Sequence, residues 1–331
     1  MNIDTDDLTT LDERSFGARV EPHRRELHVH CYRLLGSFDD AEDLVQEAFL
    51  RAWRRRETYA GRASVRAWLY RIATNACLDA LDKRPRRPSA DGEVAWLQPY
   101  PDDLLAQLPD HREGPEDVAL SRETVELAFI AAIQHLAPLP RAVLVLREVL
   151  GCSARDTAVL LETTVASVNS ALQRARGGLR HALPEDRGDW RADATAVEQA
   201  LLARYVDCTE RVDLEGLAAL LHEDARFSMP PEPGMWVGKE AVVTCWAEGG
   251  FGSDAFGSVR CVKTRANGQP AVAVYVRLPG GSDYAALTLE SLRFRDGAVA
   301  DVVNFDRSVL PHFGLPMTLD TVQSVGTVET S

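Results

Sequence analysis

The sequence predicts a multidomain fold: two all-α domains joined by an acidic linker, followed by an α+β domain. A chain of 331 residues is long enough for two or three domains. Hydrophobic residues recur at helical spacing over residues 14–84 and again over residues 116–183. From residue 194 onward, helical patterns give way to alternating strands separated by turn sequences. Helices first and an antiparallel meander after them indicate helices covering one face of a curved antiparallel sheet.

Positive charge is concentrated in two short blocks of an otherwise acidic chain. The net charge of −13 alone argues against a nucleic-acid partner. Residues 51–88, however, carry 11 basic and 3 acidic side chains, and residues 141–181 carry 6 and 3. The blocks 1–50, 89–140 and 189–331 have net charges of −7, −8 and −8. A solvated helix face would mix acids with the basic residues, so the two basic blocks predict two surfaces for an anionic partner.

The first all-α domain contains a helix over about residues 39–57 with one acidic side. Asp39 or Asp40 is the expected N-cap, and Arg54–Arg56 lie at the end where the helix dipole favours positive charge. Solvation alone accounts for the charges on this helix, but not for an exposed Leu50 among them.

The next helix, AWLYRIATNACLDAL, carries two stripes. One has the spacing of a buried face and consists of Val65, Leu69, Ile72 and Ala76. The other combines an aromatic ring, a guanidinium and a carboxamide in Trp68, Arg71 and Asn75. These groups suit a planar, charged partner such as a nucleotide. Packing in the core is an equally good interpretation for Trp68, because large aromatic residues are usually buried.

A linker follows the first domain. Prolines in KRPRRPSADGE end the helical pattern, and the sequence to about residue 115 is acidic and rich in proline. It nevertheless contains Trp96, Leu97 and Tyr100, which a passive linker does not need. We therefore expect the linker to dock on another part of the protein.

The second all-α domain ends in a predicted helix-turn-helix. A long helix is expected from about residue 116 to 136, before two short helices. Ser153 is the predicted N-cap of the first, with Asp156 as its capping-box partner, and Thr164 caps the second. The outward residues of the second helix are polar or basic: Asn169, Ser170, Gln173, Arg174 and Arg176. This pattern suits DNA recognition, although any αα-corner can produce it.

The α+β domain is predicted from three helices and four strands. Helical patterns cover residues 194–206, 213–222 and 239–248. The strands are SVRCVKTR, AVAVYVRL, AALTLESLRF and AVADVVNFD. Asn267-Gly268 and Asp296-Gly297 are strong hairpin signals between them.

The order of these segments resembles a known family. FDDAEDLVQEAFLRAWRRRETYAGRASVRAWLYRIATNACLDAL resembles region 2 of bacterial sigma factors of the extracytoplasmic-function (ECF) group within the sigma-70 family. LPRAVLVLREVLGCSARDTAVLLETTVASVNSALQRARGGL resembles their region 4, and the last part is similar to the SnoaL-like fold. That fold is appended to particular ECF subgroups, one with a linker motif like WLQPYP. The expected domains are region 2 (14–88), linker (89–115), region 4 (116–183) and SnoaL-like domain (194–317).

The resemblance implies a function and two partners. A sigma factor directs promoter-specific transcription initiation by binding core RNA polymerase and the −35 and −10 elements of promoter DNA. The resemblance implies no enzyme activity, no cofactor and no metal. The six scattered cysteines, with no CxxC pair, predict a cytoplasmic location, and no apolar run is long enough to predict a membrane helix. We expect the C-terminal domain to modulate the sigma-factor activity by controlling binding to DNA or core polymerase. The linker residues expected to take part in this regulation are Trp96, Leu97, Gln98, Pro99, Tyr100 and Pro101. The alternative function is a SnoaL-like small-molecule sensor or enzyme that uses the helix-turn-helix to localise on DNA.

The resemblance also assigns roles to individual residues. The residues expected to bind core polymerase are Asp43, Gln46, Glu47 and Leu50. Those expected at the −10 element are Trp68, Arg71, Asn75, Lys83, Arg84, Arg86 and Arg87, with Asn75 at the position that contacts a flipped base. Those expected at the −35 element are Asn169, Ser170, Gln173, Arg174, Arg176 and Arg180. Many relatives carry arginine at the position of Asn169, so their −35 preference does not transfer.

The C-terminal domain has candidate residues for a pocket and a small-molecule ligand. They are Tyr205, His222, Trp236, Trp246 and Asn304, with Asp224, Glu290 and Asp306 as further polar candidates. Each has an ordinary alternative, such as a turn former, a core aromatic or a solvated strand face. None of them is spaced as acid–base catalysis requires.

Overall fold

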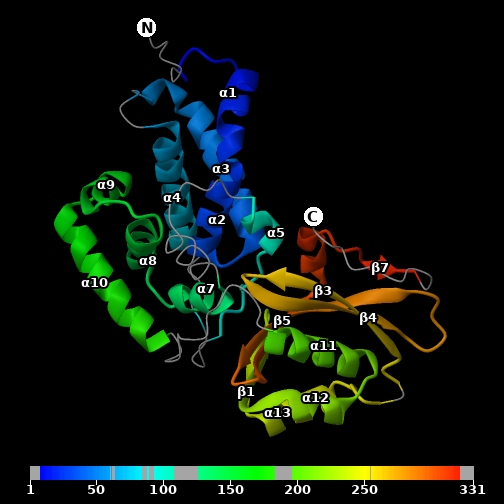
Figure 1. Cartoon of the computed structure of the whole chain (residues 1–331). Coiled ribbons are helices and arrows are strands. Elements are labelled where there is room, and N and C mark those ends of the chain that lie inside the picture. The colour runs from blue at the N-terminus through cyan, green and yellow to red at the C-terminus, as the bar shows by residue number, and fades with distance from the viewer. Residues whose placement is uncertain are drawn as a thin grey trace. The chain divides into compact units, whose positions relative to one another are not determined.

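Amphipathic helices build the N-terminal part of the chain, and a twisted sheet builds the C-terminal part (Figure 1). The computed structural model describes residues 8–59, 61, 64–83, 88, 93–107, 126–182, 196–253 and 255–320. The chain divides into two compact units, residues 1–88 with 104–185 and residues 89–103 with 186–331. Most of the described linker therefore belongs to the same unit as the C-terminal domain.

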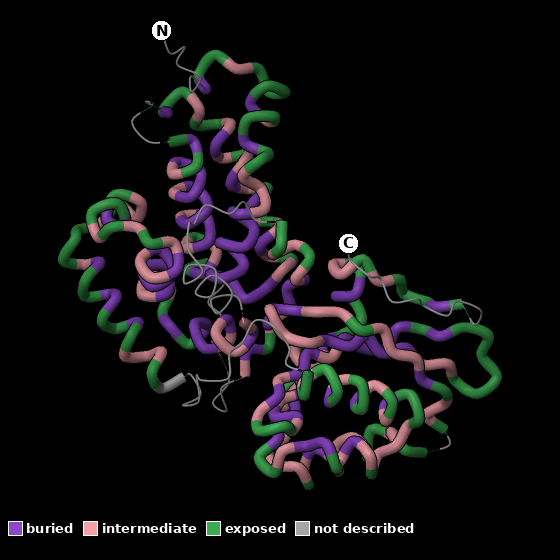
Figure 2. The backbone as a smooth tube through the Cα atoms, viewed as in Figure 1, coloured by how far each residue is buried: buried purple, intermediate pink, exposed green. Residues whose placement is uncertain are grey.

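The first half of the first unit is a helical bundle around α2. Its helices are α1 (Glu13–Val20), α2 (Arg24–Leu35), α3 (Phe38–Arg54) and α4 (Val65–Lys83), with short 3₁₀ turns η1 (Glu21–His23) and η2 (Arg56–Thr58). Every residue of α2 from Glu26 to Leu35 is buried, and Figure 2 shows this helix inside the bundle. The expected N-cap of α3 was wrong: Ser37 caps the helix by accepting a hydrogen bond from the amide of Asp40 (3.2 Å), so Asp39 and Asp40 lie in the first turn.

The second half of the first unit contains the helix-turn-helix. Its elements are α7 (Leu127–Gln134), α8 (Pro138–Leu144), η3 (Val145–Val149), α9 (Ala154–Leu160) and α10 (Val165–Ala182). Both predicted caps are confirmed: the hydroxyl of Ser153 accepts from the amide of Asp156 (3.0 Å), and that of Thr164 accepts from the amide of Ser167 (3.1 Å). The long helix expected over about residues 116–136 was wrong in its bounds: α7 begins at Leu127, after the non-helical Glu126, and ends at Gln134, while residues 108–125 lie outside the described residues.

The second unit is an α+β domain with three helices and a curved sheet. After the short linker helix α5 (Asp102–Leu105) come α11 (Ala196–Glu210), α12 (Leu214–Leu220), β1 (Leu221–Met229), β2 (Glu232–Val237), α13 (Lys239–Glu248), β3 (Ser258–Ala266), β4 (Gln269–Arg277), β5 (Tyr284–Arg295), β6 (Ala298–Asp306), η4 (Arg307–Phe313) and β7 (Thr318–Leu319). The strand order is β2-β1-β6-β5-β4-β3, and β7 pairs with β5. Helices α11, α12 and α13 cover one face of the sheet (Figure 1).

The sheet is mixed, whereas an antiparallel sheet was expected. Strands β3 to β6 form the predicted antiparallel meander, but β1 runs parallel to β6. Neither β1 nor β2 was predicted, and the helical pattern expected to reach residue 222 ends at Leu220.

None of the described helices is long and apolar enough to cross a membrane.

Candidate DNA, polymerase and regulatory surfaces

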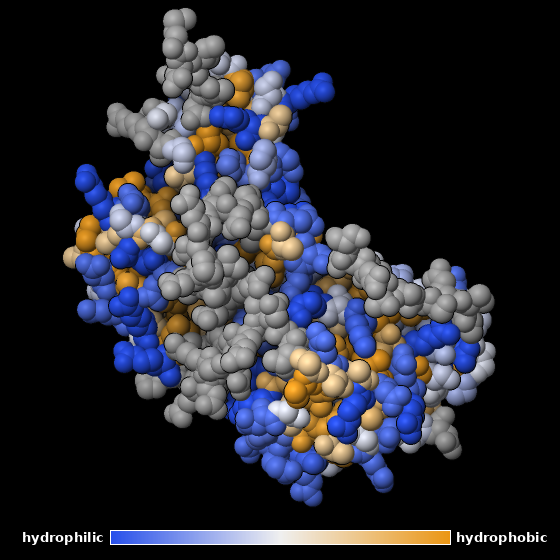
Figure 3. Space-filling model, in the orientation of Figure 1, coloured by the Kyte–Doolittle hydropathy of each residue, from blue (hydrophilic) through white to orange (hydrophobic). Residues whose placement is uncertain are grey.

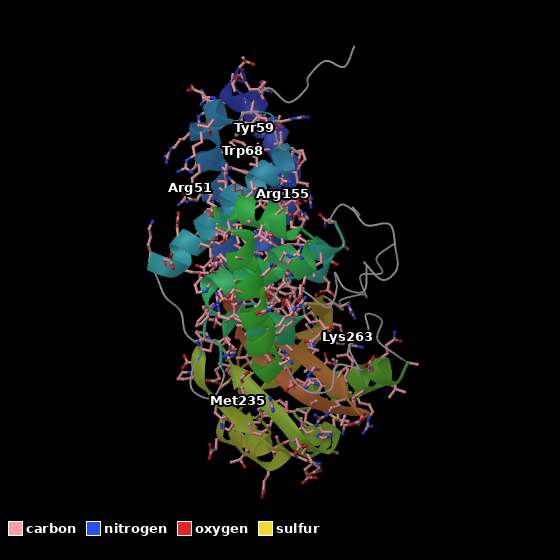
Figure 4. All side chains as sticks on the ribbon, turned by 90° about the vertical axis from the view of Figure 1, so that its left-hand side faces the viewer. Arg51, Tyr59, Trp68, Arg155, Met235 and Lys263 are labelled. Atoms are coloured by element: carbon pink, nitrogen blue, oxygen red, sulfur yellow. The ribbon has the colours of Figure 1, made fainter. Side chains whose placement is uncertain are left out.

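Three of the candidate −10 residues, Trp68, Arg71 and Asn75, lie on one side of α4. Trp68 is only 7% exposed, and its ring packs 5.2 Å from that of Tyr59. Figure 4 labels both rings at the same end of the bundle. Arg71 and Asn75, one and two turns further along α4, are half-buried. Packing therefore describes Trp68 in this structure, while the polar groups of Arg71 and Asn75 lie nearer the surface.

Two features modify this −10 surface. The guanidinium of Arg71 lies 3.8 Å from a carboxylate oxygen of Glu162, in the turn of the helix-turn-helix. Lys83, at the end of α4, is exposed. The other three basic candidates, Arg84, Arg86 and Arg87, lie outside the described residues.

The candidate −35 residues form the outer face of α10. Asn169, Ser170, Gln173 and Arg174 are exposed, whereas Val168, Ala171, Leu172 and Ala175 are buried. This 3.6-residue alternation leaves a continuous polar face, and Figure 3 shows the outer side of α10 as largely hydrophilic. An ion pair of 2.6 Å joins Arg176 to Glu148, and Arg180 is exposed. Helix α10 therefore presents hydrogen-bonding groups in line, as a recognition helix requires.

The candidate polymerase surface is the outer side of α3. Asp43 and Gln46 are exposed, and Leu50 is an exposed apolar side chain among them, at 51%. Glu47 differs, because its carboxylate accepts a hydrogen bond from Arg51 (2.8 Å). Arg51 also binds Asp79 of α4 (2.6 Å), so Glu47 is part of a contact between α3 and α4.

The linker docks on the C-terminal domain, as its apolar side chains predict. Tyr100 is 1% exposed, and Leu97 is buried as well. The backbone of Tyr100 is held twice by Asn267: its N–H donates to the side-chain oxygen (2.7 Å), and its carbonyl accepts from the amide of Asn267 (2.9 Å). Asn267 is fully buried and has a φ of 56°, in the left-handed region that asparagine tolerates.

Neighbouring contacts extend this one. We call the whole set the clasp: Arg265, Ala266, Asn267 and Gly268 of the C-terminal domain, with the linker residues Tyr100, Pro101 and Asp102 that they bind. Pro101 forms a β-bridge with Ala266. The carboxylate of Asp102 accepts from the amide of Gly268 (2.7 Å) and from Arg265 (3.1 Å). Further back in the linker, both carboxylate oxygens of Glu93 accept from the amide of Gly234 (2.9 and 3.1 Å). The clasp thus binds the backbone of Tyr100 and Pro101 and the carboxylate of Asp102.

In the C-terminal domain, three polar side chains meet on the helix-covered face of the sheet. Glu290 of β5 is paired with Asn304 of β6, and Tyr205 of α11 donates a hydrogen bond to its carboxylate (2.9 Å). Burial raises the pKa of Glu290 to about 7, although hydrogen bonds from Tyr205 and Asn304 oppose this. The side-chain oxygen of Asn304 has no hydrogen-bond partner among the described residues.

The other candidate pocket residues lie in separate clusters. Trp236 and Trp246 pack against Phe227, with ring centroids 5.5 and 5.8 Å apart. His222 instead contacts Arg295 (2.9 Å) and the backbone of Asp224. The structure therefore groups Tyr205 with Asn304 but does not bring His222 to them. The sequence named Glu290 only as a further polar candidate, whereas the structure places it between Tyr205 and Asn304.

Replacing Glu290 with Gln is expected to change how stability depends on pH. The carboxyl ionises near pH 4.5 in the unfolded chain and near 7 in the folded domain. The contribution of Glu290 to the free energy of unfolding is therefore fully present below about pH 4.5. It is lost as pH rises to 7, by up to about 3 kcal/mol. Glu290→Gln should remove this decrease in thermal unfolding between pH 4.5 and 8, whereas the exposed control Glu240→Gln should keep it. Parallel curves for all three proteins would contradict the assignment.

Comparisons with known proteins agree with this arrangement. A sigma-70 region 2 model matches residues 19–87, a sigma-70 region 4 model residues 126–177, and a SnoaL-like domain model residues 202–302. The solved structure of the Mycobacterium tuberculosis ECF sigma factor SigJ matches with a TM-score of 0.58, covering 91% of this chain and 99% of that chain. At 22% identity this likeness concerns the fold.

Sequence similarity to curated proteins extends over nearly the whole chain. The ECF RNA polymerase sigma factor SigG of Mycobacterium tuberculosis (strain ATCC 25618 / H37Rv) is 42% identical over 327 residues, covering 93% of this chain and 86% of SigG. The ECF RNA polymerase sigma factor SigW of Bacillus subtilis (strain 168) is 30% identical over 172 residues, covering 52% of this chain and 90% of SigW. This chain belongs to the ECF group of sigma-70-family RNA polymerase sigma factors and carries a C-terminal SnoaL-like domain.

Proposed function

We propose that the chain directs promoter-specific transcription initiation by binding core RNA polymerase through α3, the −10 element through region 2 and the −35 element through region 4. The observation that carries this proposal is the outer face of α10, where Asn169, Gln173 and Arg174 are exposed in line on a capped recognition helix. Asn and Gln side chains pair with adenine and Arg with guanine in the major groove.

At the −10 element we assign base reading to Asn75 and phosphate contact to Arg71. Holding a base outside the stack costs a few kcal/mol, which hydrogen bonds to its edge help to offset. Trp68 has a supporting role in this assignment, because its ring is packed against Tyr59. The chain supplies no covalent chemistry, because the polymerase catalyses RNA synthesis. It acts in the cytoplasm.

We further propose that the C-terminal domain modulates this activity through the clasp. The linker joins the two DNA-binding regions, and the clasp fixes part of it by main-chain and carboxylate contacts. A domain that binds the linker shortens the part of it that is free, and so restricts the distance between regions 2 and 4. This restriction is a physical route to regulation.

Substitutions on α10 test the −35 assignment by separating two kinds of contact. Gln173→Ala should weaken the free energy of binding to the preferred −35 site by about 1–3 kcal/mol and relax the base preference at one position of that site. Arg180→Ala should weaken binding to all sequences alike and lower the salt dependence by about one unit of slope. Fluorescence anisotropy of full-chain holoenzyme on labelled promoters at several salt concentrations measures both. The assignment fails if Gln173→Ala leaves base preference unchanged.

A further inference from the structure

The C-terminal domain holds a carboxylate in the apolar interior between its helices and its sheet. Glu290 lies on the face of β5 that also carries Leu292, and it is paired with Val272 of β4 and Asn304 of β6. Val272 and Leu292 are fully buried members of the hydrophobic core. Tyr205 of α11 reaches Glu290 from the helices that cover this face (Figure 1). Apolar groups therefore surround the Glu290 carboxylate.

No cation balances this carboxylate among the residues that the structure describes. The interactions that favour its charged form are hydrogen bonds from Tyr205 and Asn304, and burial outweighs both of them. A buried charge without a counter-ion is costly. A positive group beside Glu290 would therefore gain more than the same group beside a solvated carboxylate.

Other titratable side chains lie near Glu290. Tyr205 and Cys261 face it from α11 and β3, and burial, followed by the negative charge of Glu290, raises the pKa of both groups. Both therefore stay neutral near pH 7. Glu210 of α11 accepts a hydrogen bond from the backbone amide of Cys261 (2.9 Å) and adds a second negative charge. The surroundings of Glu290 thus favour positive charge in a ligand.

Two side chains of this group can accept further hydrogen bonds. A carboxylate accepts about four, and Glu290 accepts from Tyr205 (2.9 Å) and from Asn304. The side-chain oxygen of Asn304 is buried and has no hydrogen-bond partner in the part of the domain that is described. A buried acceptor without a donor is unfavourable, so a donor placed between Glu290 and Asn304 would be stabilised.

The polar group keeps part of its surface accessible. Glu290 and Asn304 are half-buried rather than buried, although both lie on the covered face of the sheet. Met229 of β1, Trp236 of β2 and Trp246 of α13 are likewise only partly buried, although they pack against the core. Residual exposure of several interior side chains indicates a recess with an apolar lining and a polar group in its wall.

The chemistry of these groups selects a class of ligand. An ammonium group carries a positive charge and three donors, so it can bind the Glu290 carboxylate and the Asn304 oxygen together. A hydroxyl group has one donor and no charge, and an anion would be repelled by Glu290. The apolar lining requires a hydrophobic body on the ligand.

We propose that the C-terminal domain binds a small primary amine with a hydrophobic body, and that the ammonium group pairs with Glu290 and Asn304. The proposal goes beyond the proposed function and does not depend on it, because binding is measured in the chain without polymerase or DNA.

Saturation-transfer NMR titrations of the full chain measure this binding. The probes are n-butylamine, 2-phenylethylamine and tryptamine, with 2-phenylethanol as the neutral match of the second. We expect 2-phenylethylamine to bind about tenfold more tightly than 2-phenylethanol at pH 8, because charged hydrogen bonds are stronger than neutral ones. This amine stays protonated between pH 6 and 8 while Glu290 ionises, so its affinity should rise about five- to tenfold over that range, whereas that of the alcohol should not.

Three variants connect the binding to this group. Glu290→Gln should remove the preference for the amine and keep the binding of 2-phenylethanol, which reports that the domain is folded. Tyr205→Phe removes a hydrogen bond that lowers the pKa of Glu290, so the rise in amine affinity should move to higher pH. Glu240→Gln, exposed on α13, is the matched control and should change neither result.

Three results would overturn the proposal. The first is equal affinity for 2-phenylethylamine and 2-phenylethanol, or tighter binding of the alcohol. The second is an amine preference that survives in Glu290→Gln, because the amine would then bind at another acidic surface. The third is the absence of binding by all three amines.

Discussion

Asn75→Ala should reduce open-complex formation at a cognate promoter about fivefold or more while leaving binding of the closed duplex within about twofold. Asn75 lies on the side of α4 that carries the −10 residues, and its carboxamide is the group proposed to read the extruded base. Losing a bidentate contact to a base edge costs about 1–3 kcal/mol, and this loss falls only on the state in which the base is flipped. Heparin-resistant complexes of full-chain holoenzyme measure the effect.

A matched control for this variant lies at the end of the same helix. Asp82 is exposed in the last turn of α4, and Asp82→Asn should leave open-complex formation unchanged. Equal amounts of open complex from Asn75→Ala and wild type would remove Asn75 from the −10 assignment. A parallel loss of duplex binding would show instead that the substitution damages region 2 as a whole.

Asn267→Gly should release the linker from the C-terminal domain. Glycine keeps the left-handed φ of 56° but removes the oxygen that accepts from the amide of Tyr100. Leaving that buried amide without an acceptor costs about 1–3 kcal/mol, so amide exchange at Leu97 and Tyr100 should accelerate about tenfold or more. Hydrogen–deuterium exchange with mass spectrometry measures this in the full chain.

Asp296→Gly is the matched control, because Asp296 is exposed in the other hairpin turn and has a similar left-handed φ of 52°. It should retain most of the protection that Asn267→Gly loses. Run-off transcription with Asn267→Gly then tests regulation: a changed yield supports a modulating clasp, with an increase identifying the domain as an inhibitor. Loss of linker protection with an unchanged yield would contradict regulation through the clasp.

Local signals in the sequence predicted the helices of regions 2 and 4. The caps at Ser153 and Thr164 depend on residues three positions away, so the sequence contains the whole signal. The α3 cap was assigned to Asp39 or Asp40 because Ser37, Asp39 and Asp40, all good capping residues, lie within four positions, and propensity does not choose among them. The outward face of α10 followed from helical periodicity alone.

Long-range contacts were beyond reach from the sequence. Tyr100 stood out in the sequence as an apolar residue in a polar linker. Its partner Asn267 lies 167 residues away, in a sequence that predicts only an ordinary hairpin turn. Strand β1 has little hydrophobic alternation and pairs in parallel with the distant β6, so no local pattern marked it. The sequence left Glu290 open between a pocket and a solvated strand face, because its burial depends on packing across elements.

Run-off transcription with purified bacterial core RNA polymerase, the full chain and a library of promoters tests the central claim most directly. A promoter-specificity subunit predicts discrete transcripts that depend on the chain and share paired elements near −35 and −10. They should be lost when Gln173 and Asn75 are both replaced by Ala. No transcripts from any promoter, together with normal binding of duplex DNA without polymerase, would contradict the sigma-factor function and favour a DNA-localised sensor.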